Sequence, residues 1–227
     1  MIESGIEWYQ KSDGLIDISK GSVADIWKMY RDSTTGVPTT FELKRADINN
    51  INDIELLKNT KIKNNHVSME LLDIAKGFAT YEVTKLLEKN NIDEYLISIG
   101  SSTIVGKHYN NKKYEIAIEN PINNEYEVLK GESISIINTN INQNYYEYNK
   151  KHYHDIINPK TLMPADNFVG VTVITNQIKD AFVLSKFIFL SSFENGKNLV
   201  KENKNLEVKW YIDENKIEET SNFNKYE

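Results

Sequence analysis

The spacing of apolar residues changes along the chain and predicts where helices and strands alternate. Apolar residues every three or four positions indicate amphipathic helices, and strict alternation indicates strands. The predicted helices are 2–12, 22–30, 40–52, 74–90 and 178–193. The predicted strands are 15–18, 54–63, 66–71, 95–99, 102–105, 114–119, 126–129, 133–137, 168–175 and 207–212. This order predicts an α+β fold in which helices flank a mixed β-sheet.

No repeat, low-complexity tract or linker interrupts this order. We therefore expect the whole chain, residues 1–227, to form a single domain. Ser12-Asp13-Gly14 ends the first helix in a turn. The residues from about 218 to 227 are polar, and we expect them to form a frayed tail.

The predicted helix at 74–90 has the most informative start in the chain. It follows Asp73 and carries Lys76-Gly77 close to its beginning. A lysine in a first turn opposes the helix dipole, which favours anions there. An anionic ligand such as a phosphate is therefore expected nearby, and a solvated lysine is the alternative. One face of this helix carries the apolar residues Ala79, Val83, Leu86 and Leu87.

Composition narrows the classes of function. The chain has 27 basic and 33 acidic residues and a net charge of -6, which argues against binding to nucleic-acid backbones. It has no cysteine, which excludes disulfides, zinc–thiolate sites and cysteine nucleophiles. No segment approaches the ~20 apolar residues that span a bilayer. The start of the chain has no signal-peptide pattern, so a cytoplasmic location is expected as written, or an extracytoplasmic one if a leader is missing.

Five short motifs follow one another in a recognisable order. They are Ser12-Asp13-Gly14-Leu15-Ile16-Asp17-Ile18, Asp73-Ile74-Ala75-Lys76-Gly77-Phe78-Ala79, Tyr114-Glu115-Ile116-Ala117-Ile118-Glu119-Asn120-Pro121, Tyr153-His154-Asp155-Ile156-Ile157-Asn158-Pro159 and Lys179-Asp180-Ala181-Phe182. In this order they resemble the ApbE family, the FAD:protein FMN transferases, over roughly residues 5–212. The resemblance implies an ApbE-like, T-fold-like domain that is short at its N-terminus, where the family has further strands and a helix.

The resemblance also implies a Mg²⁺-dependent reaction that moves FMN from FAD to a Ser or Thr of a protein acceptor. In relatives, the lysine–glycine helix start holds the flavin or its diphosphate, which assigns this role to Lys76 and Gly77. A Gly-Gly-Asn turn near the flavin corresponds to Gly100-Ser101 here. Asp17 stands at the aspartate of a Phe-Asp pair in relatives, and Tyr146 stands at the tyrosine of a Tyr-Glu pair that this chain shares with them. The alternative for Asp17 is stabilisation of a turn.

The implied metal ligands come from two segments. Asp180 matches the aspartate of the family's Ala-Asp-Ala, and Asp73 stands where relatives offer a backbone carbonyl. The family's ligating threonine is Leu184 here, and Ser185 is the neighbouring hydroxyl. One residue turns a helix by about 100°, so Ser185 points elsewhere unless the helix slips. The alternative for Asp180 is a helix cap.

The implied catalytic position also departs from the family. The catalytic histidine of relatives corresponds to Asp155, and His154 is its neighbour. Adjacent strand residues face opposite sides, so His154 cannot simply replace it. Asp155 would be a weaker base than histidine, since an ordinary aspartate has a pKa of about 3.9. An outward-facing polar residue is the alternative for His154.

These departures leave three hypotheses for the function. The first is an active FAD:protein FMN transferase. The second is a non-catalytic relative that binds flavin, and the third is an FAD pyrophosphatase using the same metal site. The sequence does not identify the acceptor or the oligomeric state.

Overall fold

The computed structural model describes residues 1–57, 61–108 and 112–227, which form two compact units. Unit 1 comprises Met1–Leu72 and Ile141–Ala165, and unit 2 comprises Asp73–Asn140 and Asp166–Glu227. The chain thus passes from one unit to the other after residues 72, 140 and 165. The expectation that the chain forms one domain stays a prediction.

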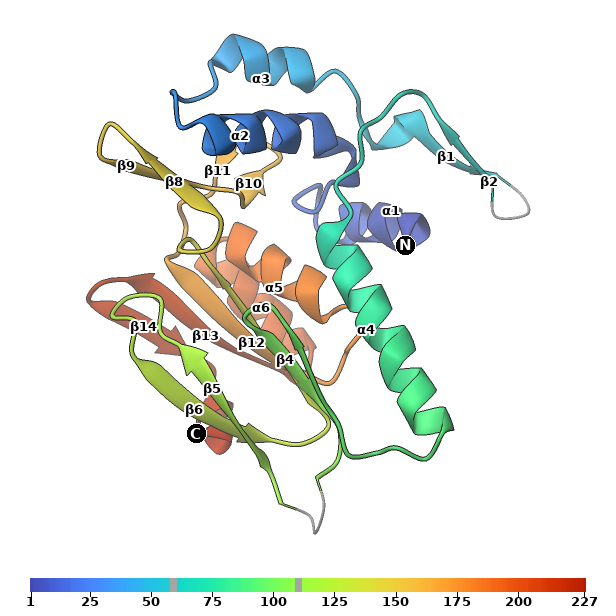
Figure 1. The fold of residues 1–227 in the computed structure, drawn as a ribbon, viewed down its shortest axis with the longest axis vertical. Helices are drawn as coiled ribbons and strands as arrows, with labels where there is room; N and C mark the ends of the chain where they lie inside the picture. Colours follow the sequence, from blue (N-terminus) through green and yellow to red (C-terminus); the bar gives the residue numbers. More distant parts are fainter. Residues whose placement is uncertain (58–60, 109–111) are drawn as a thin grey trace. The chain divides into compact units, whose positions relative to one another are not determined.

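Unit 1 combines short helices with small hairpins (Figure 1). Its helical elements are α1 (Ile2–Lys11), η1 (Ile18–Lys20), α2 (Gly21–Ser33), α3 (Thr40–Ala46) and η2 (Ile51–Asp53). Its strands form three antiparallel pairs, β1 (Ile54–Leu57) with β2 (Lys61–Asn64), β8 (Tyr145–Tyr148) with β9 (Lys151–His154), and β10 (Ile157–Asn158) with β11 (Met163–Pro164). Its core joins residues from both stretches of the chain: Val23, Trp27, Leu43, Tyr146, Tyr153 and Leu162.

Unit 2 is built on a six-stranded antiparallel sheet (Figure 1). The strand order is β14-β13-β12-β7-β4-β3. These strands are β3 (Leu96–Ile99), β4 (Ser102–Val105), β7 (Ile134–Asn140), β12 (Gly170–Thr175), β13 (Leu206–Asp213) and β14 (Lys216–Glu219). The other elements are α4 (Leu72–Lys89), the hairpin β5 (Tyr114–Glu119) and β6 (Tyr126–Gly131), α5 (Ala181–Leu190), α6 (Phe193–Glu202) and η4 (Phe223–Tyr226).

The two faces of the main sheet are covered by different elements of unit 2. On one face α5 packs on β7 and β12, and Ser185 of α5 hydrogen-bonds Thr139 of β7 at 2.7 Å. Because strand side chains alternate, the residues of β7 with even numbers lie on the other face. There the hairpin β5–β6 encloses an apolar cluster of Val105, Ile116, Ile118, Leu129, Ile134, Ile136, Ile174 and Phe223. The predicted α+β class is confirmed, but the strand pairs of the main sheet are all antiparallel, whereas a mixed sheet was expected.

Several predicted elements differ in the structure. The segment 66–71 is not a strand, because His66 has a φ of 62° and the residues after it bond the distant segment 18–21. The Gly21 N–H donates to Ser68 O at 3.0 Å, and the Glu70 N–H donates to Ile18 O at 2.9 Å. The segment 15–18 leads into η1 instead of an extended strand. The predicted strand 54–63 is a hairpin strand pair, and its residues 58–60 lie outside the described part of the chain.

Other predicted boundaries also shift. The helix expected at 40–52 ends at Ala46, and the helix expected at 22–30 begins at Gly21. The helix expected at 178–193 ends at Leu190, and Ser192 caps α6, which the apolar pattern did not indicate. The C-terminal residues do not fray: β14 pairs with β13, and Phe223 is fully buried.

The helix α4 buries a different face from the predicted one. Its buried residues are Ile74, Gly77, Thr80 and Thr84. The side chains of Val83 and Leu86 are 44% and 61% exposed. The apolar period therefore located the helix correctly but misplaced its inner face, where Gly77 allows the backbone at Lys179 to approach closely.

Candidate functional site

Three contacts hold α4 against the segment that leads into and forms α5 in unit 2. Asp73 forms an ion pair with Lys186 at 3.0 Å, and the Lys76 Nζ lies 5.8 Å from the centre of the Phe182 ring. Gly77 meets the backbone carbonyl of Lys179. From Asp73 to Gly77 along α4, the contacted residues run backwards from Lys186 to Lys179, so the two segments run antiparallel. The predicted motifs around Lys76 and Asp180 are therefore neighbours.

The position of Lys76 in its helix corrects the dipole argument. The helix α4 begins at Leu72, so Lys76 is its fifth residue, and the acidic residue of the first turn is Asp73. The free N–H groups of a helix lie in its first turn. Lys76 consequently does not oppose the dipole in the first turn, and its ammonium group rests over an aromatic ring. Its role in binding flavin stays a prediction.

Gly77 is required by a close backbone approach. A Cβ atom at this position would collide with the Lys179 carbonyl oxygen, which is backbone and cannot rotate away. The absence of a side chain lets α4 pass directly beside the residue that precedes Asp180. Gly77 thus fixes the distance between the two motifs.

We expect Gly77→Ala to lower the free energy of unfolding by about 2–3 kcal/mol, because overpacking outweighs the ~1 kcal/mol that alanine gains in a helix interior. Gly100→Ala is the matched control. Gly100 has a φ of +60° but open space around its Cβ position, so only about 1 kcal/mol of backbone strain is expected. Denaturant titration of both variants checks this order, and equal losses would contradict it.

The Gly100-Ser101 turn joins β3 to β4 at one end of the main sheet. The Ser101 hydroxyl donates to the Asn138 carbonyl of β7 at 3.1 Å. The turn is therefore tied to the sheet by a side chain, while the Cβ position of Gly100 is open. The role of the Gly100-Ser101 turn in binding flavin stays a prediction.

The predicted metal ligands offer few side-chain donors. The Asp73 carboxylate already pairs with Lys186, and Ser185 is fully buried with its hydroxyl bonded to Thr139. Leu184 is also buried and presents no donor. Asp180 precedes α5 without a side-chain cap bond to it. Within residues 1–57, 61–108 and 112–227, no group of three or more acidic or histidine side chains is arranged to hold a metal.

A single carboxylate is nevertheless compatible with magnesium. Mg²⁺ commonly keeps several waters and uses one or two carboxylates together with substrate phosphates. Asp180 could therefore serve as the one protein carboxylate of an ion that arrives with a diphosphate, whereas the described residues form no site made of protein ligands alone. Ser185 as a ligand would require its bond to Thr139 to break.

Asp17 of unit 1 serves as the cap of η1. Its Oδ1 accepts bonds from the Ser19 N–H at 2.9 Å and the Ser19 hydroxyl at 2.6 Å, and Lys20 lies 3.5 Å from its Oδ2. Its carboxylate is 5% exposed. These contacts agree with the alternative role of Asp17 in stabilising a turn.

Tyr146 belongs to the aromatic core of unit 1. Its ring stacks on Tyr153 with centres 5.4 Å apart, and Tyr153 stacks on Trp27 at 5.8 Å. Its hydroxyl donates to the Gly36 carbonyl at 3.1 Å. Burial, together with Tyr153 and Tyr30, raises the pKa of Tyr146 to about 12, so the phenol stays neutral. A packing role therefore accounts for its contacts, and a flavin contact stays a prediction.

His154 is buried, which contradicts the alternative of an outward-facing polar residue. Its Nδ1 accepts the Ile156 N–H at 3.2 Å, so its Nε2 carries the proton and donates to the Ala165 carbonyl at 2.8 Å. Both ring nitrogens thus hold the backbone on either side of the following loop. These bonds suit a residue that positions Asp155 better than one that transfers a proton.

Asp155 is exposed beside Arg31 of α2. The Arg31 Nη1 lies 3.5 Å from the Asp155 Oδ2, and the two side chains are 24% and 41% exposed. Sequence reasoning missed Arg31, since 124 positions separate the two residues and no local pattern connects them. It also missed Lys186, although a single cation in the apolar helix α5 is a usable signal.

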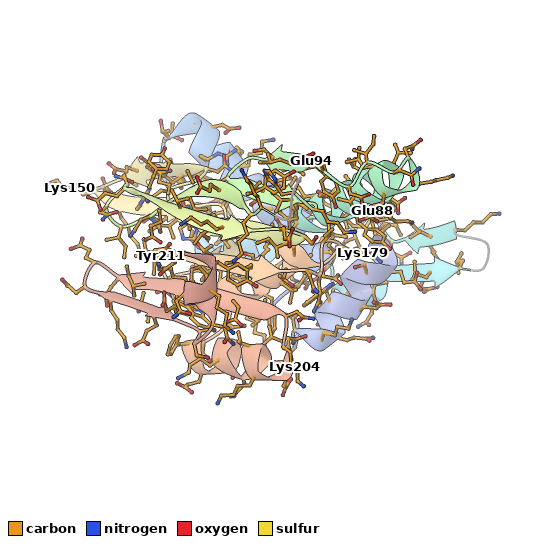
Figure 2. The ribbon with its side chains drawn as sticks, turned by 90° about the horizontal axis from the view of Figure 1, so that it is seen from below. Glu88, Glu94, Lys150, Lys179, Lys204 and Tyr211 are labelled. Atoms are coloured by element: carbon orange, nitrogen blue, oxygen red, sulfur yellow. The ribbon has the colours of Figure 1, made fainter. Side chains whose placement is uncertain are left out.

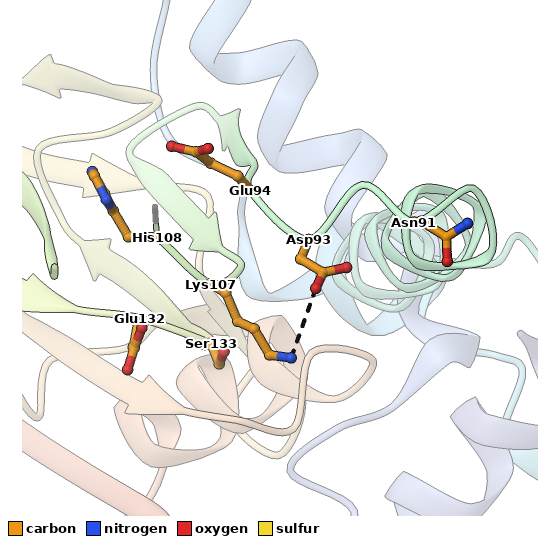
Figure 3. A pocket seen from close by; sticks show the side chains of 7 residues that line it. All are labelled: Asn91, Asp93, Glu94, Lys107, His108, Glu132 and Ser133. Atoms are coloured by element: carbon orange, nitrogen blue, oxygen red, sulfur yellow. Dashed lines mark ion pairs between the residues drawn. The ribbon is translucent and has the colours of Figure 1, made fainter. Parts of the chain in front are cut away.

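A pocket of about 540 Å³ in unit 2 lies outside the predicted site (Figure 3). It is lined by Asn91, Asp93, Glu94, Lys107, His108, Glu132 and Ser133. Lys107 pairs with Asp93 at 3.8 Å, as the dashed line shows. Most of these side chains are exposed.

In the described part of the chain, no helix is both long enough and apolar enough to span a bilayer.

The sequence profile of the ApbE family matches residues 1–210. A protein of Buchnera aphidicola subsp. Baizongia pistaciae named FAD:protein FMN transferase is 28% identical over 234 residues, which cover 92% of this chain and 68% of that protein. A Vibrio cholerae protein of the same name is 26% identical over 211 residues, covering 89% and 63%.

Solved structures show the same fold. The ApbE protein of Thermotoga maritima superposes with a TM-score of 0.86 at 20% identity, covering 100% of this chain and 76% of that one. The flavin transferase ApbE of Vibrio cholerae gives a TM-score of 0.80 at 20% identity, covering 100% and 75%. The architecture is therefore that of a helix-flanked antiparallel sheet shared with flavin transferases. With the profile match, this chain belongs to the ApbE family.

Proposed function

We propose that this protein transfers FMN from FAD to a Ser or Thr hydroxyl of a protein acceptor. The observation that carries the proposal is the close packing of α4 on the segment before α5, in a member of the ApbE family. This packing places the Lys76-Gly77 and Asp180 motifs side by side. The proposed activity is the one stated in the names of its curated relatives. The chain spans about two thirds of their length.

The reaction breaks one P–O bond of FAD and forms another. The acceptor hydroxyl oxygen attacks the phosphorus on the flavin side of the diphosphate, and AMP leaves. The hydroxyl proton passes to a base, and the product is a phosphodiester between FMN and the acceptor. Such reactions depend mainly on positioning and on stabilising the charge of the phosphoryl oxygens.

The residues of unit 2 are assigned to the donor. The Lys76 ammonium would bind the diphosphate, and the Gly100-Ser101 turn would lie against the flavin portion. Asp180 would hold a Mg²⁺ ion that enters with FAD. When bound, this ion neutralises charge on the diphosphate. Asp73 contributes indirectly, because its pair with Lys186 fixes the first turn of α4.

Asp155 is assigned to the acceptor hydroxyl as the proton acceptor. A carboxylate that is already ionised can accept a proton, but its low basicity limits the rate. His154 would keep the Asp155 loop in place through its bonds to Ile156 and Ala165. The proposal therefore predicts a slow transferase.

The test is to incubate the purified protein with FAD, Mg²⁺ and a candidate acceptor protein, and to read covalent flavin by in-gel fluorescence. Asp180→Asn keeps the size of the side chain and removes its charge, and we expect at least tenfold less labelling than with the unsubstituted protein. Labelling that is unchanged in Asp180→Asn, or in the presence of EDTA, would contradict the assignment of the metal.

We expect Lys76→Ala to weaken FAD binding by about tenfold or more, because a hydrogen bond to a charged group contributes about 1.5–3 kcal/mol. Lys85→Ala is the matched control: Lys85 lies on the same helix, is 52% exposed and pairs with Glu82. Quenching of flavin fluorescence measures both affinities. Equal affinities for Lys76→Ala and the unsubstituted protein would remove Lys76 from the site.

A second function is favoured by specific departures from the family pattern. Leu184 is a buried apolar residue where relatives have a ligating threonine, and Asp155 is paired with Arg31. These features fit a protein that binds FAD without transferring FMN. Measuring FMN and AMP released in the same incubations separates the cases: FAD bound without products supports the non-catalytic protein, and FMN plus AMP without labelling supports a pyrophosphatase.

A further inference from the structure

One continuous stretch of unit 2 is apolar in sequence and yet uncovered. Across residues 85–100, all of which the structure describes, no residue is buried. This stretch contains the end of α4 and the whole of β3. Its apolar side chains include Leu86, Ile92 and Leu96, which are 61%, 45% and 51% exposed. Large exposed apolar surfaces of this kind mark sites where another molecule binds.

The two edges of the main sheet differ in how they meet solvent. The sheet ends in β14 on one side and in β3 on the other, and in the described part of the chain β3 pairs only with β4. The sequence of β14 is Lys-Ile-Glu-Glu, and charged residues are the usual protection of a free edge. The sequence of β3 is Leu-Ile-Ser-Ile, without any charge. β3 therefore has the composition of an interior strand at the position of an edge strand.

The free edge of β3 presents backbone groups in a defined pattern. The Gly106 N–H donates to the Tyr95 carbonyl at 3.0 Å, so the Tyr95 carbonyl points towards the neighbouring strand. Backbone groups alternate along an antiparallel strand, so those of Leu96 and Ser98 point towards the free edge. A further extended strand would find N–H and C=O groups to pair with at these two residues.

The helix α4 adds an exposed stripe that has the apolar pattern of a buried helix face. Ala79, Val83 and Leu86 follow one another at spacings of four and three, and all three are exposed. Glu88, which Figure 2 labels, lies in the last turn of α4, shortly before the chain enters β3. The stripe and the free edge thus belong to consecutive elements of unit 2.

Two observations indicate that the missing cover is polypeptide. A row of backbone N–H and C=O groups is matched along its length by another extended backbone. In addition, this chain covers 76% of the Thermotoga maritima ApbE protein and 75% of the Vibrio cholerae flavin transferase, so about a quarter of each lies outside the shared fold. A quarter of such a chain exceeds the ~6 residues of an average strand and the ~12 of an average helix together.

We propose that the stripe of α4 (Ala79, Val83 and Leu86) and the free edge of β3 bind a further polypeptide segment. This segment adds an extended strand to β3 and covers the stripe with apolar side chains. It corresponds to the part of the solved relatives that this chain does not cover. The proposal does not depend on the transfer of FMN, so its tests measure binding instead of activity.

The probe is the part of the Buchnera aphidicola subsp. Baizongia pistaciae protein outside its 234 matched residues, made as a separate polypeptide and added to the 227-residue chain. Calorimetry measures binding, and hydrogen exchange locates it. We expect the amides of Leu96 and Ser98 to exchange at least about tenfold more slowly with the probe bound. The amides of Ile97 and Ile99, which face β4, should change less. No binding, or protection confined to other parts of the chain, would overturn the proposal.

Matched substitutions test each half of the surface. Leu96→Lys is expected to weaken binding by about tenfold or more, since it places a charge in the buried contact. Ile217→Lys is its control, because Ile217 is an apolar residue of the other edge strand and is 43% exposed. Val83→Glu should weaken binding similarly, whereas Val128→Glu of β6 should not, although the two valines are 44% and 46% exposed. Equal affinities within either pair would remove that half of the surface from the site.

Light scattering distinguishes a second copy of this chain from the proposed segment. The probe is expected to form a one-to-one complex with a single copy. A dimer that dissociates in Leu96→Lys but not in Ile217→Lys, and that excludes the probe, would show that the chain covers this surface with itself. That result would overturn the proposal.

Discussion

Asp155→His combined with Leu184→Thr is expected to raise the rate of FMN transfer by about 10²-fold or more, because a positioned general base contributes 10²–10⁴ to a rate. The two substitutions restore the residue types that the family resemblance places at these positions. In-gel flavin fluorescence over time, with the same acceptor and FAD concentration, measures the rate. Asp155→Asn is expected to lower the rate below that of the unsubstituted protein, since an amide cannot accept the proton.

The surroundings of position 155 favour a histidine, and those of position 184 offer a partner for a threonine hydroxyl at a cost in stability. A histidine at position 155 would lie beside the Arg31 guanidinium, whose charge disfavours a protonated imidazole and keeps it neutral as a base. A threonine at position 184 can bond the Asp180 carbonyl one turn earlier, where the Leu184 N–H already bonds at 2.8 Å. The loss of a buried leucine side chain costs about 2–3 kcal/mol of stability.

The single variants distinguish the causes. If Asp155→His alone gives the full increase, the base limits the reaction and position 184 is unimportant. If the double variant gives no increase while FAD still binds, the proposed base role of position 155 is wrong. An unsubstituted protein as fast as its relatives would show that the Asp155 carboxylate is already a competent base.

Lys209→Met is expected to lower the free energy of unfolding by about 2–4 kcal/mol, because it leaves carboxylates without their buried cation. The Lys209 side chain is 9% exposed, and its Nζ lies 2.8 Å from Glu127, 3.0 Å from Glu227 and 3.8 Å from Glu219. These contacts tie β6, β14 and the C-terminal residue to β13. Lys216→Met, which removes an exposed lysine 3.6 Å from Glu218, is the matched control and should cost under ~0.5 kcal/mol.

The effect of Lys209 has a defined pH dependence. Burial alone would lower the pKa of its ammonium group, but hydrogen bonds with Glu127 and Glu227 outweigh burial and raise it. A raised pKa in the folded state stabilises the protein fully below the unfolded value of about 10.4, and this contribution is lost as pH rises through the folded value. Urea titrations of the unsubstituted protein and of Lys209→Met at pH 8 and above pH 11 should therefore show that the difference between their free energies of unfolding is smaller at the higher pH. A difference that stays constant with pH would contradict a raised pKa of Lys209 in the folded state.

The helices and most strands of this fold could be predicted because their periods are local properties of the sequence. Which face of α4 is buried could not, since it depends on the distant carbonyl of Lys179 meeting Gly77. A glycine within a helix was the available signal, because it commonly marks a close approach. The apolar residues Val83 and Leu86 gave the opposite indication.

The candidate site was predictable as a set of motifs but not as a set of contacts. Asp73 and Lys76 were identified, whereas their partners Lys186 and Phe182 become visible only when α5 is placed beside α4. The alternative of an outward-facing His154 was wrong because alternation along a strand treats the strand as open on one side. In the structure the loop after β9 folds back. The Ala165 carbonyl and the Ile156 N–H then form hydrogen bonds with the two ring nitrogens of His154.

The path of the chain through the two units has a consequence for biosynthesis. The Trp27 indole N–H donates to the Leu162 carbonyl, 135 positions later, and Tyr146 and Tyr153 complete the same core. During translation, the first 72 residues of unit 1 must therefore wait until residues 141–165 leave the ribosome, while most of the strands of unit 2 emerge in the interval. At ~5–20 residues per second this delay lasts several seconds, during which Trp27 lacks its aromatic partner Tyr153 and is open to chaperones.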